Sequence, residues 1–190
     1  MEGTCWDERD PALWADQRNE TEVIEIGAVL LDADGDRTFR ALVRPRRHPV
    51  LSARCTELTG LTQAEVDAAR PFAAVHEAFL AWLGDERDVL FVGWGAWDDR
   101  QLRRECLRAG LPAPRWRALN LKRRYARSCG HGGLRTAVER LGGAFEGTAH
   151  RALDDARNAA FVYRALTSRR PGGGSSASCS GGGTGSRSSR

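Results

Sequence analysis

The stretch Glu22-Val-Ile-Glu-Ile-Gly-Ala-Val-Leu-Leu31 decides the fold class of this chain. It is rich in β-branched and apolar residues, which is typical of a buried strand. Asp34-Gly35 then favours a tight turn, and residues 37–43 alternate weakly between polar and apolar side chains. Since Pro45 cannot continue a strand ladder, the pattern predicts an antiparallel hairpin that ends before it.

Helices and further strands are predicted to alternate after this hairpin. Thr62-Gln-Ala-Glu65 has the pattern of a capping box, and Pro71 opens an amphipathic helix that Gly84 ends. Residues 89–92 are apolar throughout, which predicts a fully buried strand. A further strand is predicted at 116–121, and helices at 98–110, 133–141 and 154–166. This order of elements indicates an α/β fold.

Length and composition indicate one globular domain with a tail. The chain has 190 residues, of which 41% are hydrophobic and 28% charged, as in ordinary globular proteins. We assign the domain to residues 1–169 and expect the Gly/Ser-rich residues 170–190 to be disordered, since they cannot bury enough apolar surface to offset their ordering entropy. Without an apolar run that could cross a bilayer or a signal segment, we expect a cytoplasmic protein with no membrane partner.

The charge is concentrated in short clusters. The formal net charge is +4, and the span from Arg115 to Arg127 contains no acidic residue. Such clusters are more often solvated faces than binding sites, but they suit a polyanionic substrate. The five cysteines form no CxxC pair, so we expect free thiols and no zinc site.

Four separated residues carry the chemistry: Glu2, Asp98, His150 and Asp155. Carboxylate oxygens are the ligands that Mg²⁺ prefers, and a neutral imidazole nearby can take a proton from water. Taken singly, each residue has an ordinary structural interpretation, such as a helix cap or a solvated terminus. If they converge, the combination predicts metal-assisted hydrolysis of a phosphodiester.

Taken together, these residues match a known pattern. Glu2-Gly-Thr-Cys-Trp6, Trp97-Asp98 and the His-x-x-x-x-Asp spacing of His150 and Asp155 resemble the three motifs of the DEDDh exonuclease family, which has the ribonuclease-H-like fold. Residues 51–62 are similar to the segment between the first two motifs in the histone-mRNA 3′-exonuclease branch. The resemblance implies a mixed sheet flanked by helices.

The family implies an activity and a metal set. It implies a 3′–5′ exonuclease that uses two Mg²⁺ or Mn²⁺ ions held by Glu2, Asp98 and Asp155, with His150 as the base that deprotonates the attacking water. The implied partner is the 3′ end of single-stranded RNA or DNA, with RNA favoured by the branch, and no obligate protein partner is expected.

The family also implies contacts to the terminal nucleotide. Thr4 would contribute through its backbone, Leu61 as an apolar wedge and Trp97 beside a base. The basic span from Arg115 to Arg127 would contact the nucleic-acid backbone.

The sequence departs from the family at its beginning. The family's first motif starts with an Asp two positions before Glu2, and its first central strand precedes that Asp. Neither is present, so we expect that the recorded start is misplaced and that an apolar strand and an Asp lie upstream. The alternative is a true truncation in which Asp7, Glu8 or Asp10 substitutes.

Two other functions stay open at this point. One is a nucleic-acid-binding module of the same fold without catalysis, which the absent Asp favours. The other is a proofreading subunit of a DNA polymerase, which would need a docking segment.

Overall fold

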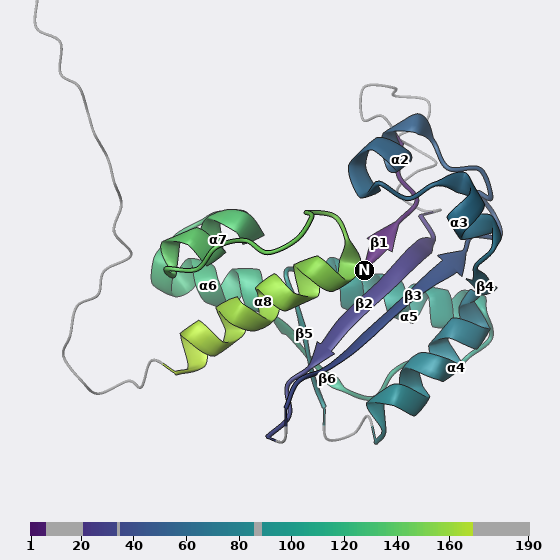
Figure 1. The fold of residues 1–190 in the computed structure, drawn as a ribbon. Coiled ribbons are helices and arrows are strands. Elements are labelled where there is room, and N and C mark those ends of the chain that lie inside the picture. Colours follow the sequence, from purple (N-terminus) through teal and green to yellow (C-terminus); the bar gives the residue numbers. More distant parts are fainter. Residues whose placement is uncertain (7–20, 34, 86–88, 169–190) are drawn as a thin grey trace, which may run out of the picture.

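A computed structural model describes residues 1–6, 21–33, 35–85 and 89–168 as an α/β protein (Figure 1). The predicted tail at 170–190 and the candidate substitutes Asp7, Glu8 and Asp10 lie outside the described residues. In the described ranges the strands are β1 (Glu2–Gly3), β2 (Val23–Leu30), β3 (Arg37–Arg44), β4 (Arg70–Pro71), β5 (Leu90–Gly93) and β6 (Arg117–Asn120). The helices of the same ranges are α2 (Ala53–Thr59), α3 (Gln63–Asp67), α4 (Phe72–Leu83), α5 (Trp97–Arg108), α6 (Leu121–Cys129), α7 (Leu134–Arg140) and α8 (Ala152–Thr167).

The described strands form two separate ladders. One has the order β1-β2-β3-β4, and the other is the pair β5-β6. The predicted hairpin is confirmed: β2 and β3 pair antiparallel, with Glu25 opposite Leu42 and Leu30 opposite Arg37. The strands β5 and β6 run parallel, so their carboxyl ends, and the helices that follow them, lie at one edge.

Local signals fix most helix ends. The capping box at Thr62 and Glu65 is confirmed, with each side chain bonded to the backbone N–H of the other. Pro71 is the N-cap of α4 rather than its first residue. The last helix begins at Ala152, two residues earlier than predicted, and α2 and α6 were not predicted.

Helices cover both faces of the strands (Figure 1). The helix α8 packs on β2, while α4 packs on β3, and α5 packs on both β2 and β5. The core on the α4–α5 face includes Val23, Ile26, Phe79, Leu102 and Trp116. A second core joins α6, α7 and α8 around Tyr125, Val138 and Val162.

One detail of the predicted core is wrong. The strand β5 is not fully buried, since Leu90 is 39% exposed. Leu107 of α5 is 80% exposed. In the described ranges no helix is long and apolar enough to cross a bilayer.

Candidate active site

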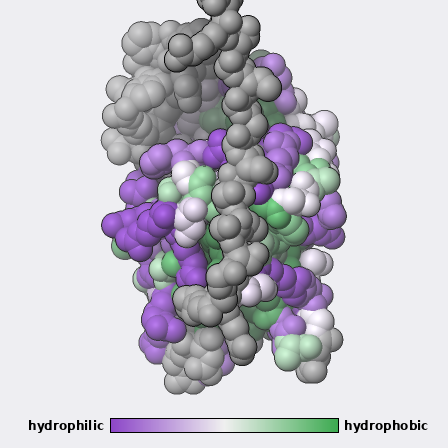
Figure 2. All heavy atoms as spheres, turned by 90° about the vertical axis from the view of Figure 1, so that its left-hand side faces the viewer, coloured by the Kyte–Doolittle hydropathy of each residue, from purple (hydrophilic) through white to green (hydrophobic). Residues whose placement is uncertain are grey.

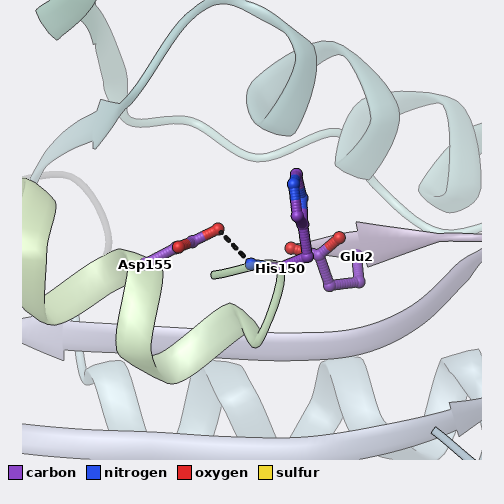
Figure 3. A group of neighbouring side chains, drawn as sticks. All are labelled: Glu2, His150 and Asp155. Atoms are coloured by element: carbon purple, nitrogen blue, oxygen red, sulfur yellow. Dashed lines mark hydrogen bonds between the residues drawn. The ribbon is translucent and has the colours of Figure 1, made fainter. Parts of the chain in front are cut away.

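Three residues that are distant in sequence meet at one point. Glu2 comes from β1, His150 from the loop before α8, and Asp155 from the first turn of α8 (Figure 3). One ligand atom of each residue lies within 4.8 Å of those of the other two. Two carboxylates and an imidazole at this spacing are a set of donors that can hold a divalent cation.

Asp98 lies beside this group, in the first turn of α5. Its Oδ1 accepts a hydrogen bond from the α-ammonium group of Met1 at 2.9 Å. Asp98 lines the same cavity as Glu2, His150 and Asp155. All four residues predicted to carry the chemistry therefore line one cavity, although Asp98 is not among the three that lie within 4.8 Å of one another.

His150 has an unusual backbone conformation. Its φ is +63°, the only positive φ among the described non-glycine residues. Its backbone N–H donates to Asp155 Oδ2 at 3.3 Å, which is the dashed line in Figure 3. Such left-handed residues are costly and are concentrated at functional sites. In this conformation His150 is exposed, while its backbone N–H is hydrogen-bonded to Asp155 in the first turn of α8.

The cluster has an excess of negative charge. The pKa of Glu2 is raised to about 7: burial is the largest cause, the Met1 ammonium group opposes it, and Asp155, Glu25 and Asp98 add to the rise. Burial also raises the pKa of Asp155. Burial alone would lower the pKa of the Met1 ammonium group, but Asp98, Glu2 and Asp155 together outweigh it and raise that pKa. A site that concentrates carboxylates in this way is stabilised by a bound cation, so the residues present fit a metal.

A buried glutamate, which the sequence analysis missed, holds the beginning of α8 in place. Glu25 is 0% exposed and accepts a hydrogen bond from the backbone N–H of Ala152 at 2.9 Å. It also pairs with Arg40 at 2.8 Å and with Arg151 at 3.5 Å. Glu25 is opposite Glu2 in the β1–β2 register. The signal in the sequence was an acid inside an otherwise apolar strand.

Close backbone contact explains a glycine in the same strand. A Cβ added at Gly27 would lie 2.2 Å from the backbone nitrogen of Leu153. Only glycine lets β2 approach α8 this closely. Glu25 and Gly27 therefore fix the helix turn that carries Asp155 against the strand beside Glu2.

Neighbouring acids have other roles. Asp154 accepts a hydrogen bond from the backbone N–H of Thr148 at 2.9 Å and is not part of the cluster. Asp99 accepts hydrogen bonds from Arg103 at 3.0 Å and from the indole of Trp116 at 3.0 Å. These contacts distinguish structural acids from those of the cluster.

The three expected nucleotide-binding residues are placed differently from one another. Trp97 is 40% exposed, and its ring lies so close to Gly3 that a Cβ there would be 3.0 Å away. Leu61 is 0% exposed in a core cluster with Ile24, so the structure does not place it on a binding surface. Thr4 is 3% exposed, and its backbone N–H, donated to the Glu22 carbonyl at 2.8 Å, is not available to a nucleotide.

The fold and this cluster define an α/β protein with a carboxylate–histidine site. Comparison with known families agrees: a model described as Exonuclease (RNase_T) matches residues 2–163. The chain belongs to the DEDDh 3′-exonuclease branch of this family. The predicted ribonuclease-H-like mixed sheet with flanking helices is confirmed.

Relatives come from animals and bacteria. The chain is 36% identical to ERI1 exoribonuclease 2 of Danio rerio, over 87% of this chain and 34% of that protein. It is 32% identical to the probable 3′-5′ exonuclease KapD of Bacillus subtilis, over 75% of this chain and 72% of that protein. The chain spans about a third or less of the length of the curated animal proteins named ERI1 exoribonuclease 2.

A solved structure has the same arrangement of elements. The nuclease domain of 3′hExo, a DEDDh family member bound to rAMP, superposes with a TM-score of 0.74 at 28% identity. The superposition covers 89% of this chain and 90% of that one. Members of the family are metal-dependent 3′–5′ exonucleases.

Proposed function

We propose that this protein is a metal-dependent 3′–5′ exonuclease that removes nucleotides from the 3′ end of single-stranded RNA. The observation that carries the proposal is the meeting of Glu2, His150 and Asp155 within 4.8 Å, with Asp98 beside them. The relatives named as exoribonucleases, and the rAMP in the 3′hExo structure, support RNA over DNA.

In this proposal Glu2, Asp98 and Asp155 hold the metal, which is Mg²⁺ or Mn²⁺. Their oxygens are the hard ligands that either ion prefers. When bound, the metal supplies charge stabilisation to the phosphate oxygens under attack and to the leaving oxygen. Bound metal also favours the ionised form of Glu2 and of Asp155, whose pKa values are raised in its absence.

His150 is the proton acceptor. It is exposed and close to both carboxylates, so a water between it and the cluster is within its reach. The imidazole takes one proton from this water, the water oxygen bonds to phosphorus, and the bond from phosphorus to the 3′ oxygen of the preceding nucleotide breaks. That 3′ oxygen takes a proton from solvent water, His150 returns its proton to solvent, and a nucleoside 5′-monophosphate leaves.

Two surfaces are proposed to hold the RNA. The half-exposed ring of Trp97 lies beside Gly3, the residue after Glu2, and suits stacking on a base. The helix α6 begins at the carboxyl end of β6 and carries the exposed residues Lys122, Arg123, Arg124 and Arg127. Figure 2 shows the side of the molecule that carries α6, α7 and α8, where hydrophilic side chains are exposed among hydrophobic ones. We propose that the α6 cations contact the phosphate backbone.

The test compares two neighbouring carboxylates. The chain is incubated with 5′-labelled single-stranded RNA and Mg²⁺, and the products are resolved by length. We expect stepwise shortening from the 3′ end, abolished by chelation of the metal. Asp155→Asn should reduce the rate by more than about 100-fold, since even outer-shell partners of metal ligands are worth roughly 10- to 100-fold.

Asp154→Asn is the matched control. Its amide oxygen can still accept the hydrogen bond of Thr148, so we expect a rate near that of the unaltered protein. RNA binding without shortening would contradict the proposal and indicate a binding module. Equal loss in both variants would also contradict it, and a faster rate on the matched DNA would overturn the preference for RNA.

A further inference from the structure

Two cysteines from distant parts of the sequence meet beside β1. Cys5 follows that strand and is partly exposed, whereas Cys55 lies in α2 and is fully buried. Their side chains pack in one cluster, and the Cys5 thiol is hydrogen-bonded to the sulfur of Cys55. Two neighbouring thiols, one of them near the surface, are the arrangement from which a disulfide can form without a large backbone movement.

One hydroxyl group fixes the backbones of both cysteines. Ser52, the N-cap of α2, donates to the Cys5 carbonyl at 2.5 Å and accepts a hydrogen bond from the Cys55 backbone N–H at 3.0 Å. The Cys55 thiol also faces β1, since its sulfur lies 3.8 Å from the carbonyl oxygen of Gly3. The backbone geometry therefore holds the two thiols side by side.

The two thiols differ in how readily they lose a proton. The hydrogen bond from the Cys5 side chain is the main cause that lowers the pKa of Cys55 to about 7, against the raising effect of burial. The same hydrogen bond and burial raise the pKa of Cys5. At neutral pH the pair therefore carries a thiolate in part of the molecules, and the thiolate is the reactive form of cysteine.

We propose that Cys5 and Cys55 are a site of reversible oxidation by a small disulfide, and that the bond formed between them weakens the metal site at Glu2. The second part rests on the proposed function. The path to Glu2 is short, because the Gly3 carbonyl that faces the Cys55 thiol belongs to the next residue of β1. Oxidation removes that S–H donor and ties Cys5 to α2, and metal ligands tolerate little displacement.

The reaction is a pair of thiol–disulfide exchanges. The partly exposed Cys5 passes its proton to the Cys55 thiolate along their hydrogen bond, and its sulfur bonds to one sulfur of the small disulfide, whose S–S bond breaks and releases a thiolate. Cys55 then gives the proton to the released thiolate, and its sulfur attacks Cys5. This second step forms the internal disulfide and releases the other half of the reagent as a thiolate. The cysteine pair loses two electrons, and the reagent gains them.

The first arm of the test maps the bond. The 190-residue chain is incubated with oxidised glutathione at neutral pH, remaining thiols are alkylated, and the digested protein is analysed by mass spectrometry. We expect one cross-linked product that joins the peptides of Cys5 and Cys55, and we expect dithiothreitol to open it. A bond that joins a different pair, or glutathione that stays on Cys5 in the unaltered chain, would overturn the proposal.

Two variants separate the roles of the cysteines. Cys55→Ala removes the second nucleophile, so Cys5 should retain glutathione as a stable mixed disulfide. Cys5→Ser removes the accessible thiol, so Cys55 should stay unmodified in its buried position. Cys5→Ser changes a partly exposed residue, and it decides the case if Cys55→Ala does not fold. Glutathione on Cys55 in Cys5→Ser would contradict the assigned order of attack.

The second arm measures Mg²⁺ binding by calorimetry to the reduced, oxidised and re-reduced chain. We expect the dissociation constant to rise about tenfold on oxidation, as when a support of a metal ligand is lost, and to return on reduction. Cys5→Ser treated with oxidised glutathione is the control, and its affinity should not change with treatment. Equal affinities of the reduced and oxidised chain would overturn the link to Glu2.

Failure of the proposed function would look different. A reduced chain that binds no Mg²⁺ would contradict the metal site itself and the link to Glu2 with it. The map of the disulfide would still decide whether the two thiols form a site of oxidation.

Discussion

The Glu25 carboxylate accepts a hydrogen bond from the backbone N–H of Ala152 at 2.9 Å, so a buried strand residue holds the first residue of the helix that carries Asp155. Glu25→Ala would leave that buried N–H and the two arginine partners without the carboxylate. Breaking a buried ion pair costs about 3–5 kcal/mol, and we expect the free energy of unfolding, measured in urea, to fall by about 3 kcal/mol.

The conservative variant separates charge from geometry at this position. Glu25→Gln keeps an acceptor for Ala152 and should retain more stability than Glu25→Ala, with activity reduced less. Surface substitutions change the free energy of unfolding by up to about 0.5 kcal/mol. If the free energy of unfolding of Glu25→Ala differs from that of the unaltered chain by no more than this, Glu25 does not hold α8.

Gly27 gives a second test of the contact between β2 and α8. Gly27→Ala would force a Cβ to within 2.3 Å of the backbone carbon of Ala152. Neither backbone can move freely there, so we expect a loss of about 3 kcal/mol in thermal or urea unfolding. Gly133→Ala is the control, because a Cβ there meets nothing within 4 Å, and its cost should stay below about 1 kcal/mol. Similar losses in the two variants would show that the close approach is not the cause.

The role of His150 is tested by a substitution with a residue that tolerates the positive φ of this position. Asn adopts positive φ more readily than Ala, so His150→Asn removes the imidazole with little strain at φ +63°. We expect kcat to fall by about 10²-fold or more, as for loss of a general base, with the melting temperature unchanged. Added imidazole should restore part of the rate in the smaller His150→Gly variant. Full activity of either variant would exclude His150 as the base.

The raised pKa of Glu2 predicts opposite effects of pH on stability and on metal binding. In the metal-free protein that pKa is about 7, against an ordinary value of 4.5. Between these values the folded state binds a proton that the unfolded state lacks, so the free energy of unfolding falls as pH rises through the window. Metal binding requires the ionised carboxylate and should strengthen over the same range.

Melting temperatures with a chelator and with Mg²⁺, at pH 5.5 and 7.5, measure both effects. The chelated protein should lose stability toward pH 7.5, and Mg²⁺ should raise its melting temperature more at pH 7.5 than at pH 5.5. Glu2→Gln should flatten both trends. A chelated protein that gains stability from pH 5.5 to 7.5 would contradict the assignment.

Salt dependence tests the α6 surface. Each phosphate contact on a single strand contributes about 0.7 to the slope of log K against log salt. Replacing Arg123 and Arg127 with Ala should lower the slope by roughly this amount per lost contact, with similar weakening for different RNA sequences. Arg70→Ala, at the exposed strand β4, is the control. A slope that changes only in the control would move the RNA path away from α6.

The elements with strong local signals were predictable. The β2–β3 hairpin follows from an apolar run and an Asp-Gly turn, and α3 from its capping box. The helix α6 was missed because four of its nine residues are basic, and only Leu121 and Tyr125 are buried. The exposure of β5 depends on which strands lie beside it, and no pattern within residues 89–92 contains that information.

The convergence of distant residues was predictable, but the supports of the candidate site were not. Motif spacing pointed to Glu2, Asp98, His150 and Asp155, and the structure brings ligand atoms of Glu2, His150 and Asp155 within 4.8 Å of one another, with Asp98 lining the same cavity. Leu61 was assigned to a nucleotide by resemblance, whereas packing against Ile24 buries it. The hydrogen bond from Ala152 to Glu25 joins positions 127 residues apart, and a single sequence carries no record of such a contact.

The division of the sheet into two ladders has a consequence for the chemistry. Glu2 belongs to the first ladder, and Asp98 lies in α5, which follows a strand of the second. Asp155 lies in α8, which packs against strands of both ladders. A small shear between the halves would therefore change the spacing of the carboxylates before it disturbed either core. The turnover rate would then depend on the alignment of the two ladders. An ångström-scale displacement between them would stop catalysis in a protein that still melts cooperatively.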